Sequence, residues 1–445
     1  MGGAAAGALM AHAGRRTLVL EKNKIVGGRC TSYEKDGFIV DLGVHLFGVG
    51  DKGSLGDVCR RIDMPDAIAW VTIDQPVLQV GDKIGKYSRA NMMKTLPKEE
   101  TDNLGRLFQE MARLTPADID ELWYVPLEEW VNRFSRDPKA HAFIQMIGGQ
   151  YFRVGLDSAR TAEFINSFQE VVMARGSAYP RGGCIAIPKA YLSGVEKYGG
   201  RYLTEAGVRR VIVENGAAVG GRLEDGTEFR APVIISNADI KVTVSDLVGP
   251  EHFPADYVER INGLTWSYHC MALKVALEER ITGHQLLMYQ PYGTEDGKNL
   301  ERKLSGELLP DLVPGMVTAP TNYDPSLAPA GRQMIFYGTA CPAKADWKKW
   351  GKVLLDSFFA CYPRAKGKVL WHRLDTPDLV NAYAGESGNI IGVGQTVDQI
   401  KDRRPSVVTP LPGLYLASAE AGGHGIGTEL AADSARELCD ILTAQ

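Results

Sequence analysis

The sequence predicts an α/β protein with a second, discontinuous α+β domain. Three observations favour this fold class. An alanine-rich run with spaced glycines precedes the apolar run 18–20, a β-branched run with an Asp-Gly turn follows residue 207, and helical periodicity fills residues 91–175. At 445 residues the chain is long enough to form the cores of two or three domains.

The first expected element is a helix at the N-terminus. Gly3 and Gly7 lie four residues apart, so one helical face lacks side chains and can approach a strand or a pyrophosphate closely. The start of such a helix offers N–H groups and the positive end of the helix dipole to phosphate. Glu21 ends the following strand, where a carboxylate can accept hydrogen bonds from ribose hydroxyls.

A dinucleotide fingerprint consists of a strand, the pattern Gly-x-Gly-x-x-Gly, a helix and a second strand that ends in an acid. Only the later parts are present here, so the sequence predicts a Rossmann-like domain whose first strand is missing. On these residues alone, an alanine-rich helix followed by an unrelated buried strand stays open as the alternative.

Two further segments decide between these alternatives. Residues 18–29 read LVLEKNKIVGGR, and residues 37–48 read GFIVDLGVHLFG. Together they resemble the phytoene desaturase and amine oxidase superfamily of FAD-dependent oxidoreductases, in particular its carotenoid desaturases and isomerases. The resemblance implies that Glu21 binds the adenosine ribose and that Gly28 and Arg29 lie against the pyrophosphate. A planar guanidinium can pair with phosphate oxygens at two points.

The resemblance continues to the C-terminus. Residues 376–395 read TPDLVNAYAGESGNIIGVGQ, and residues 412–432 read PGLYLASAEAGGHGIGTELAA. The resemblance implies that the backbone of Val208 contacts the adenine edge. It also implies that a helix beginning near Gly427 and Thr428 directs its positive end at the N1 and O2 region of the flavin, which stabilises the anionic reduced cofactor.

Two departures from the family pattern predict weakened FAD binding. The first strand and the first two glycines of the fingerprint are absent, which implies either a start upstream of Met1 or a chain that holds FAD poorly. Family members usually carry Gly-Asp where this chain has Ser418 and Ala419. Glu420 is the adjacent carboxylate, although side chains alternate along a strand.

His45 is the candidate catalytic residue, because an imidazole beside the flavin can move a proton or bond a cofactor oxygen. A structural histidine bonded to the backbone is the alternative. No metal site is expected. The predicted FAD-binding residues are Gly2, Gly3, Glu21, Gly28, Arg29, Val208, Glu420, Gly427 and Thr428.

The expected FAD-binding domain is discontinuous, with parts at residues 1–75, 179–241 and 371–445. The substrate domain comprises the mostly helical block 76–178 and the mixed block 242–370. The two blocks are expected to pack together over the flavin. This arrangement predicts a substrate pocket at a domain interface.

Composition indicates an ordinary cytoplasmic enzyme. The net charge of −4 argues against nucleic-acid binding, and the seven scattered cysteines are expected to be free, buried thiols in a reducing compartment. No run of about 18 uncharged apolar residues could span a membrane. The stretch 344–350, KADWKKW, leaves peripheral contact with a membrane surface open beside a solvated helix face. No residue pattern indicates an oligomeric state.

The function implied by the resemblance is hydride transfer between a hydrophobic substrate and flavin N5. The substrate class is an isoprenoid, a carotenoid or an alicyclic compound, and the reaction is desaturation, saturation or isomerisation. Two alternatives stay open. One is a flavin amine oxidase, and the other is a flavin-free binding protein on the same scaffold, like the GDP-dissociation inhibitors.

Overall fold

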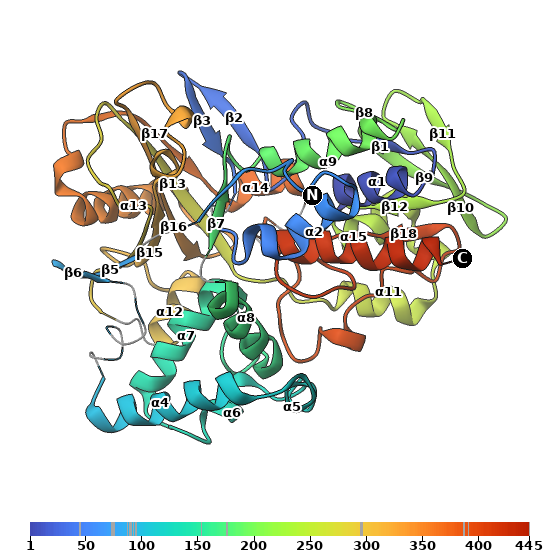
Figure 1. Cartoon of the computed structure of the whole chain (residues 1–445). Helices are drawn as coiled ribbons and strands as arrows, with labels where there is room; N and C mark the ends of the chain where they lie inside the picture. Colours follow the sequence, from blue (N-terminus) through green and yellow to red (C-terminus); the bar gives the residue numbers. More distant parts are fainter. Residues whose placement is uncertain are drawn as a thin grey trace.

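A computed structural model of the chain describes residues 1–43, 46–72, 76–86, 88, 91, 93, 96–152, 154–174, 177–293, 297–385, 388–389 and 391–444. Figure 1 shows three groups of elements. A mixed group at the right contains both termini, a large sheet covered by a helix lies at the left, and a set of helices lies below.

The group that contains both termini is built on two parallel strand pairs. Its elements are α1 (Gly2–His12), β1 (Leu18–Leu20), α2 (Ser54–Arg61), α9 (Ala186–Lys197), β8 (Arg201–Leu203), β9 (Val208–Glu214), β10 (Ala217–Leu223), β11 (Glu228–Arg230), β12 (Ile234–Ser236), α11 (Ala255–Asn262), α14 (Pro377–Ala384), β18 (Leu414–Leu416) and α15 (Thr428–Thr443). Strand β1 pairs in parallel with β8, and β12 pairs in parallel with β18. Helix α1 packs against α9 and α15.

The expected N-terminal helix is therefore present as α1. Alanine has the highest helix propensity, and the alanines of α1 are buried. A Cβ atom on Gly7 would lie 2.4 Å from Cγ2 of Val19, so the glycine lets α1 approach β1 closely. Gly14 follows the helix with φ +78°, a conformation that suits glycine and ends the helix.

The predicted hairpin after residue 207 also forms. Strands β9, β10 and β11 make an antiparallel sheet. Gly226 has φ +87° in the turn between β10 and β11, and Thr227 N donates to Oδ1 of Asp225 at 2.9 Å. The Asp-Gly pair thus makes the turn that the sequence predicts.

The large sheet has seven strands in the order β17-β13-β16-β15-β14-β5-β6. Their bounds are β5 (Val77–Val80), β6 (Lys83–Lys86), β13 (His269–Leu277), β14 (Leu286–Gln290), β15 (Gly315–Thr318), β16 (Gln333–Cys341) and β17 (Val369–Asp375). The pairs are antiparallel except for β5 with β14. Helix α13 (Trp347–Cys361) packs against one face of the sheet through a separate buried cluster.

The helical block below the sheet comprises α4 (Lys98–Arg113), α5 (Pro116–Asp120), α6 (Leu127–Val131), α7 (Pro138–Phe152) and α8 (Thr161–Ala174), with α12 (Gly297–Ser305) beside it (Figure 1). Leu104, Leu107, Phe108 and Met111 form the buried face of α4, as their spacing predicts. Thr115 caps α5 through a reciprocal capping box with Asp118.

The remaining strands form two short antiparallel pairs: β2 (Ser32–Lys35) with β3 (Phe38–Asp41), and β4 (Trp70–Thr72) with β7 (Ala178–Pro180). The α/β fold class is confirmed, and the exact domain limits stay a prediction. All seven cysteines are free and buried, as expected. Among the helices of the described residues, none combines the length and the apolar character that a membrane span requires.

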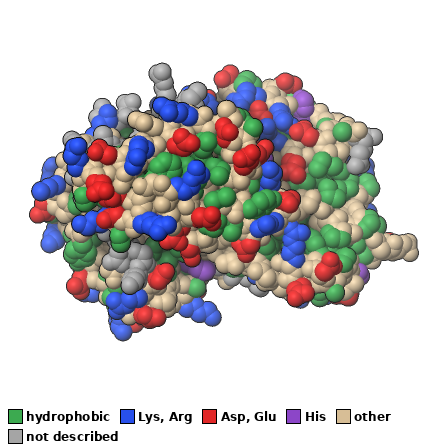
Figure 2. All heavy atoms as spheres, turned by 90° about the horizontal axis from the view of Figure 1, so that it is seen from below, with side chains coloured by type: hydrophobic (Ala, Val, Ile, Leu, Met, Phe, Trp, Pro, Cys, Tyr) green, Lys and Arg blue, Asp and Glu red, His purple; other side chains and the backbone are tan. Residues whose placement is uncertain are grey.

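The stretch 344–350 leads into α13, and its tryptophans turn toward the protein. Trp350 is 4% exposed within the cluster between α13 and the sheet, and Trp347 Nε1 donates to Asp378 at 2.7 Å. Lys348 and Lys349 remain exposed. Figure 2 shows another face, seen from below, on which acidic and basic side chains are interspersed with hydrophobic ones. Membrane contact stays a prediction that co-sedimentation with anionic vesicles would test.

Candidate functional site

A cavity of about 1100 Å³ lies between the group that contains both termini, the large sheet and the helical block. One end is lined by Arg29, Leu42, Gly43 and the turn 424–429. The large sheet contributes residues of β13 to β16, and α5 and α8 contribute residues from the helical block. The cavity therefore joins parts of the chain that are far apart in the sequence, at the kind of interface where ligands commonly bind.

The start of α1 is held close to the neighbouring strands. A Cβ atom on Gly2 would lie 2.1 Å from the Ala417 carbonyl oxygen, and one on Gly3 would lie 3.2 Å from Cβ of Asn237. Only glycine fits at Gly2 without movement of the backbone. Glu21 and Arg29 both act electrostatically on the amino group of Met1. The predicted ribose and pyrophosphate residues therefore converge on the start of α1.

Glu21 lies at the end of β1, as the sequence predicts. Its Oε1 accepts hydrogen bonds from the backbone N of Asn23 at 2.9 Å and from its side-chain amide at 3.1 Å. The Glu21 carbonyl accepts from Ala206 N at 2.9 Å. Val208 follows two residues later and lines a second cavity of about 410 Å³ together with Lys22. Val208 and Glu21 are thus brought to neighbouring positions.

Arg29 reaches from the Gly-Gly turn to the C-terminal part of the chain. Gly27 and Gly28 have φ values of +110° and +59°, which glycine adopts readily. Arg29 Nη1 donates to the Asn389 carbonyl at 3.1 Å and to its Oδ1 at 2.9 Å, while Nη2 lies 3.6 Å from Oε1 of Glu420. The guanidinium is therefore fixed at the wall of the cavity.

Glu420 is a buried carboxylate that points toward Arg29. Its Oε2 accepts from Ile240 N at 2.7 Å, and its Oε1 has no hydrogen-bond partner within the described part of the chain. Burial raises the pKa of Glu420 to about 7, against the lowering effect of Arg29. The alternation of side chains along a strand does not determine where the Glu420 side chain points, because β18 ends at Leu416 and Glu420 lies outside the strand.

Glu420→Gln is expected to stabilise the FAD-free chain at alkaline pH. Since burial raises this pKa from its ordinary 4.5 to about 7, the folded state holds the proton more tightly, and stability falls as pH rises through that window. At 1.36 kcal/mol per pKa unit, the variant is more stable by roughly 3 kcal/mol at pH 8 and by nothing at pH 4. Urea unfolding at both pH values, with the exposed Glu121→Gln as control, measures this difference. Equal gains at both pH values would contradict it.

Helix α15 begins at the cavity. Gly427 precedes it with φ +56°, and Thr428 is its first residue. Gly427 has no side chain to cap the helix, and both residues line the cavity. Gly43, which also lines the cavity, lies beside Arg29, since a Cβ atom on it would come within 2.2 Å of the Arg29 carbonyl oxygen. His45, the candidate catalytic residue, lies outside the described residues.

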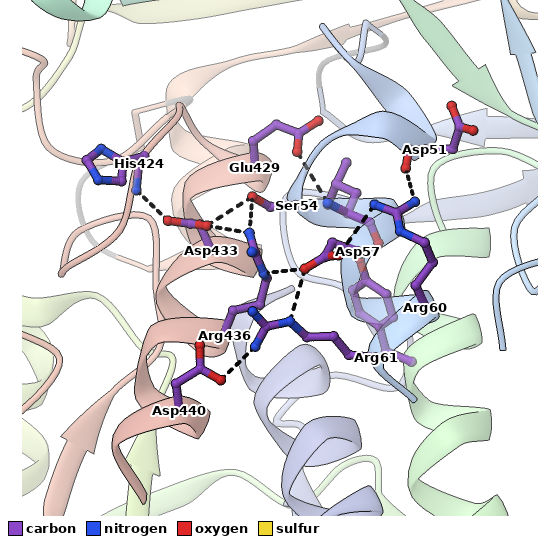
Figure 3. Close-up of polar contacts among 12 residues, drawn as sticks. Asp51, Ser54, Asp57, Arg60, Arg61, His424, Glu429, Asp433, Arg436 and Asp440 are labelled. Atoms are coloured by element: carbon purple, nitrogen blue, oxygen red, sulfur yellow. Dashed lines mark hydrogen bonds and ion pairs between the residues drawn. The ribbon is translucent and has the colours of Figure 1, made fainter. Parts of the chain in front are cut away.

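An ion-pair cluster joins α2 to α15 beside the cavity (Figure 3). Asp57 accepts from Arg61 Nε at 3.0 Å and pairs with Arg436 Nε at 2.7 Å. Asp433 in turn pairs with Arg436 at 2.7 Å and accepts from His424 N at 2.6 Å. The cluster thus connects α2 with both α15 and the turn that precedes it.

Asp57→Asn should loosen this connection, because Arg60, Arg61 and Arg436 lose their shared carboxylate. We expect the free energy of unfolding to fall by about 1.5–3 kcal/mol, the usual range for charge-assisted hydrogen bonds. Urea unfolding measures the fall. Asp356→Asn removes an exposed ion pair with Lys352 on α13 and is the control, with an expected loss of less than about 1 kcal/mol. A loss for Asp57→Asn no larger than the control's would show that the cluster does not stabilise the fold.

A buried network that the sequence does not predict lies beside the cavity. Lys274 Nζ donates to the Asp41 carbonyl at 2.6 Å and lies 3.6 Å from Oδ2 of Asp375. The Asp41 carboxylate accepts from the Tyr179 hydroxyl at 2.6 Å and from the Ser32 hydroxyl at 2.6 Å. Burial lowers the pKa of Lys274 and raises the pKa of Asp375, which lines the cavity. The one signal in the sequence that could have indicated this network is a lysine, Lys274, within an apolar strand.

These residues fit a bound dinucleotide flavin. Glycines allow the start of α1 to come close to a ligand, Arg29 supplies a planar cation, and the start of α15 supplies a positive dipole end. The Oε1 atom of Glu420 is a buried acceptor for which a ligand hydroxyl would supply the donor. The donor set is therefore appropriate to phosphate and polyol groups.

A sequence profile described as flavin containing amine oxidoreductase matches residues 1–442. The chain belongs to this family. The prediction of an FAD-dependent oxidoreductase of the desaturase and amine oxidase superfamily is thereby confirmed.

Within the family, the chain is similar to the chloroplastic prolycopene isomerase of Arabidopsis thaliana, with 27% identity over 78% of this chain and 63% of that protein. It is also similar to the zeta-carotene-forming phytoene desaturase of Myxococcus xanthus, with 25% identity over 91% of this chain and 85% of that protein. The chain thus spans less than two thirds of the Arabidopsis relative.

Solved structures share the fold. An oxidoreductase from Methanosarcina mazei superposes with a TM-score of 0.76, at 20% identity over 99% of this chain and 98% of that one. Putrescine oxidase with bound putrescine gives a TM-score of 0.70, at 12% identity over 100% and 98% of the two chains. Rab GDI from Plasmodium falciparum gives 0.59 at 12% identity, over 99% and 96%. The scaffold therefore supports enzymes and a protein named as a GDP-dissociation inhibitor, and the fold alone does not separate them.

Proposed function

We propose that this chain moves a hydride between a C–H bond of a hydrophobic isoprenoid, carotenoid or alicyclic substrate and N5 of FAD. The reaction is a desaturation, a saturation or an isomerisation of double bonds. The observation that carries the proposal is an apolar sheet surface that continues from the Arg29 end of the cavity. Met288, Met316, Gly338 and Ala272 share that surface. The similarity to enzymes named for carotenoids supports the same substrate class.

In this proposal FAD supplies the redox chemistry, and the chain binds, orients and shields it. Glu21 and Val208 hold the adenosine part, while the start of α1 and Arg29 hold the pyrophosphate. Glu420 accepts a hydrogen bond from a hydroxyl of the cofactor, and the start of α15 stabilises negative charge on the flavin. The residues assigned to FAD are Gly2, Gly3, Glu21, Gly28, Arg29, Val208, Glu420, Gly427 and Thr428.

The protein must also exclude water and accept or donate a proton. Asp375 is the candidate for the proton transfer, because this residue lines the cavity and burial raises the pKa of its carboxyl group. Lys274 and Arg373, whose Nε lies 3.1 Å from Oδ1 of Asp375, hold that carboxyl in position. His45 stays the catalytic residue that the sequence predicts.

The test is to load the chain with FAD and mix it anaerobically with a carotenoid and, separately, with an alicyclic hydrocarbon. The proposal expects loss of the oxidised flavin absorbance near about 450 nm with a desaturation substrate. It expects a changed product spectrum with unchanged flavin for isomerisation, and reoxidation of chemically reduced flavin for saturation. Hydrogen peroxide release on incubation with amines in air, where O2 accepts the electrons, would instead support an amine oxidase. Failure to bind FAD would support the flavin-free binding protein.

A further inference from the structure

The floor of the cavity consists of three rows of residues that cross the large sheet. In the row nearest Arg29, Thr318 pairs with Phe336, and Phe336 pairs with Lys274. Lys274 reaches the Asp41 carbonyl, which precedes Leu42 and Gly43 at that end of the cavity. This row therefore marks the cofactor end of the floor.

The middle row is apolar and small. Met288 pairs with Met316, Met316 with Gly338, and Gly338 with Ala272. All four residues line the cavity, and Gly338 and Ala272 leave space above the strands. A hydrocarbon chain would contact this row along its length.

The far row is different, because it contains a buried amide. Gln290 is the last residue of β14. Its side chain lies on the same face of the sheet as that of Met288, because the two residues are two positions apart in the strand. The row also contains Pro314, Ala340 and Cys270, which line the cavity with Gln290. At about 3.3 Å per residue, four residues along the strands place this row roughly 13 Å from the cofactor end.

Gln290 is 6% exposed, and its Oε1 has no hydrogen-bond partner among the residues that the structure describes. Lys303 of α12 lies over the same end of the sheet, since α12 packs against β16 and Gly306, just after the helix, lies beside Pro342. Lys303 is 1% exposed and lines the cavity. A buried amide oxygen without a donor is unfavourable, so a ligand that donates a hydrogen bond to it would be selected.

We propose that the substrate is a hydrophobic chain that ends in a hydroxyl group, which donates to Oε1 of Gln290 at the end of the sheet that Lys303 covers. This inference rests on the proposed function, because it takes the cavity as the substrate site. The reacting carbons then lie over the cofactor end, and the apolar middle row supports the chain between them. A pure hydrocarbon would bury Gln290 against carbon and leave its oxygen unpaired.

The test uses the FAD-loaded chain and three ligands with the same C20 polyprenyl skeleton: geranylgeraniol, geranylgeranoic acid and the oxygen-free hydrocarbon. Dissociation constants come from the perturbation of the flavin spectrum in detergent micelles. The variants are Gln290→Leu and Lys303→Met, and Met288→Leu in the middle row is the matched control. FAD stoichiometry and thermal unfolding verify that each variant is folded.

We expect geranylgeraniol to bind at least tenfold more tightly than the hydrocarbon, and Gln290→Leu should abolish this preference. A preference for the acid that Lys303→Met abolishes would overturn the inference and indicate a carboxylate instead. Met288→Leu should change all three constants by the same factor. The inference is overturned if the hydrocarbon binds as tightly as the others, or if Gln290→Leu weakens all three alike. Oxygen-selective binding with no flavin reduction, no flavin reoxidation and no isomerisation of any substrate tested would count against the proposed function but not against this inference.

Discussion

Arg29→Met is expected to weaken FAD binding by about 100-fold. The guanidinium lies beside the start of α1 and at the wall of the cavity, where it is held by Asn389 and faces Glu420. Charge-assisted hydrogen bonds contribute about 1.5–3 kcal/mol each, so losing two of them to a pyrophosphate corresponds to two or more powers of ten in the dissociation constant. Titration of the FAD-free protein with FAD, followed by flavin fluorescence, measures the change.

Arg29→Lys separates the charge of this residue from its geometry. Lysine keeps the charge but cannot form two parallel hydrogen bonds, so we expect an intermediate loss of about tenfold. Arg222→Met on β10 is the control, because its exposed guanidinium pairs with Glu228 away from the cavity. If Arg29→Met retains stoichiometric FAD through purification, Arg29 does not bind the pyrophosphate, and its contacts with Asn389 and Glu420 are purely structural.

The sequence predicted those parts of the site that lie in continuous segments. The glycines of α1, the strand that ends at Glu21 and the Gly-Gly-Arg turn are local features, and local backbone rules are sufficient to place them. The residues they contact could not be predicted in the same way. Arg29 meets Asn389 across 360 residues, and Arg61 of the α2 cluster meets Asp440 across 379. No periodicity connects such positions, because only packing of the whole chain brings them together.

The direction of Glu420 illustrates a second reason. Alternation along a strand argues against a side chain that points toward the cofactor, but that rule applies only while the chain remains in the strand. The chain leaves β18 after Leu416, and Glu420 turns to Arg29 and Ile240. Element boundaries are therefore as important as element types for placing a site residue. The sequence indicates no end of this strand before residue 420, so it could not decide the direction of the Glu420 side chain.

Lys274→Met is expected to cause the largest loss of stability among single substitutions near the cavity. Lys274 is fully buried, and its ammonium contacts the Asp41 carbonyl and the Asp375 carboxylate. Methionine fills a similar volume but leaves Asp375 paired only with Arg373 among the ion pairs described. Removing one partner of a buried pair typically costs about 3–5 kcal/mol, because the other charge stays buried. Urea unfolding followed by circular dichroism measures the loss.

The double variant Lys274→Met with Asp375→Asn tests the cause of that loss. If the cost arises from a buried carboxylate without its lysine, neutralising Asp375 should restore about half of the stability, and the two substitutions will not be additive. If the cost arises from the Asp41 carbonyl, which holds the segment leading to Gly43, the double variant will be no more stable than the single one. The FAD affinity of the double variant separates these two causes independently. Displacement of the segment that leads to Gly43 would disturb the cofactor end of the cavity and lower the affinity, whereas loss of the Asp375 charge alone would not. A single variant as stable as the parent chain would show that the pair contributes nothing to the fold, as some buried ion pairs do not when apolar groups replace them.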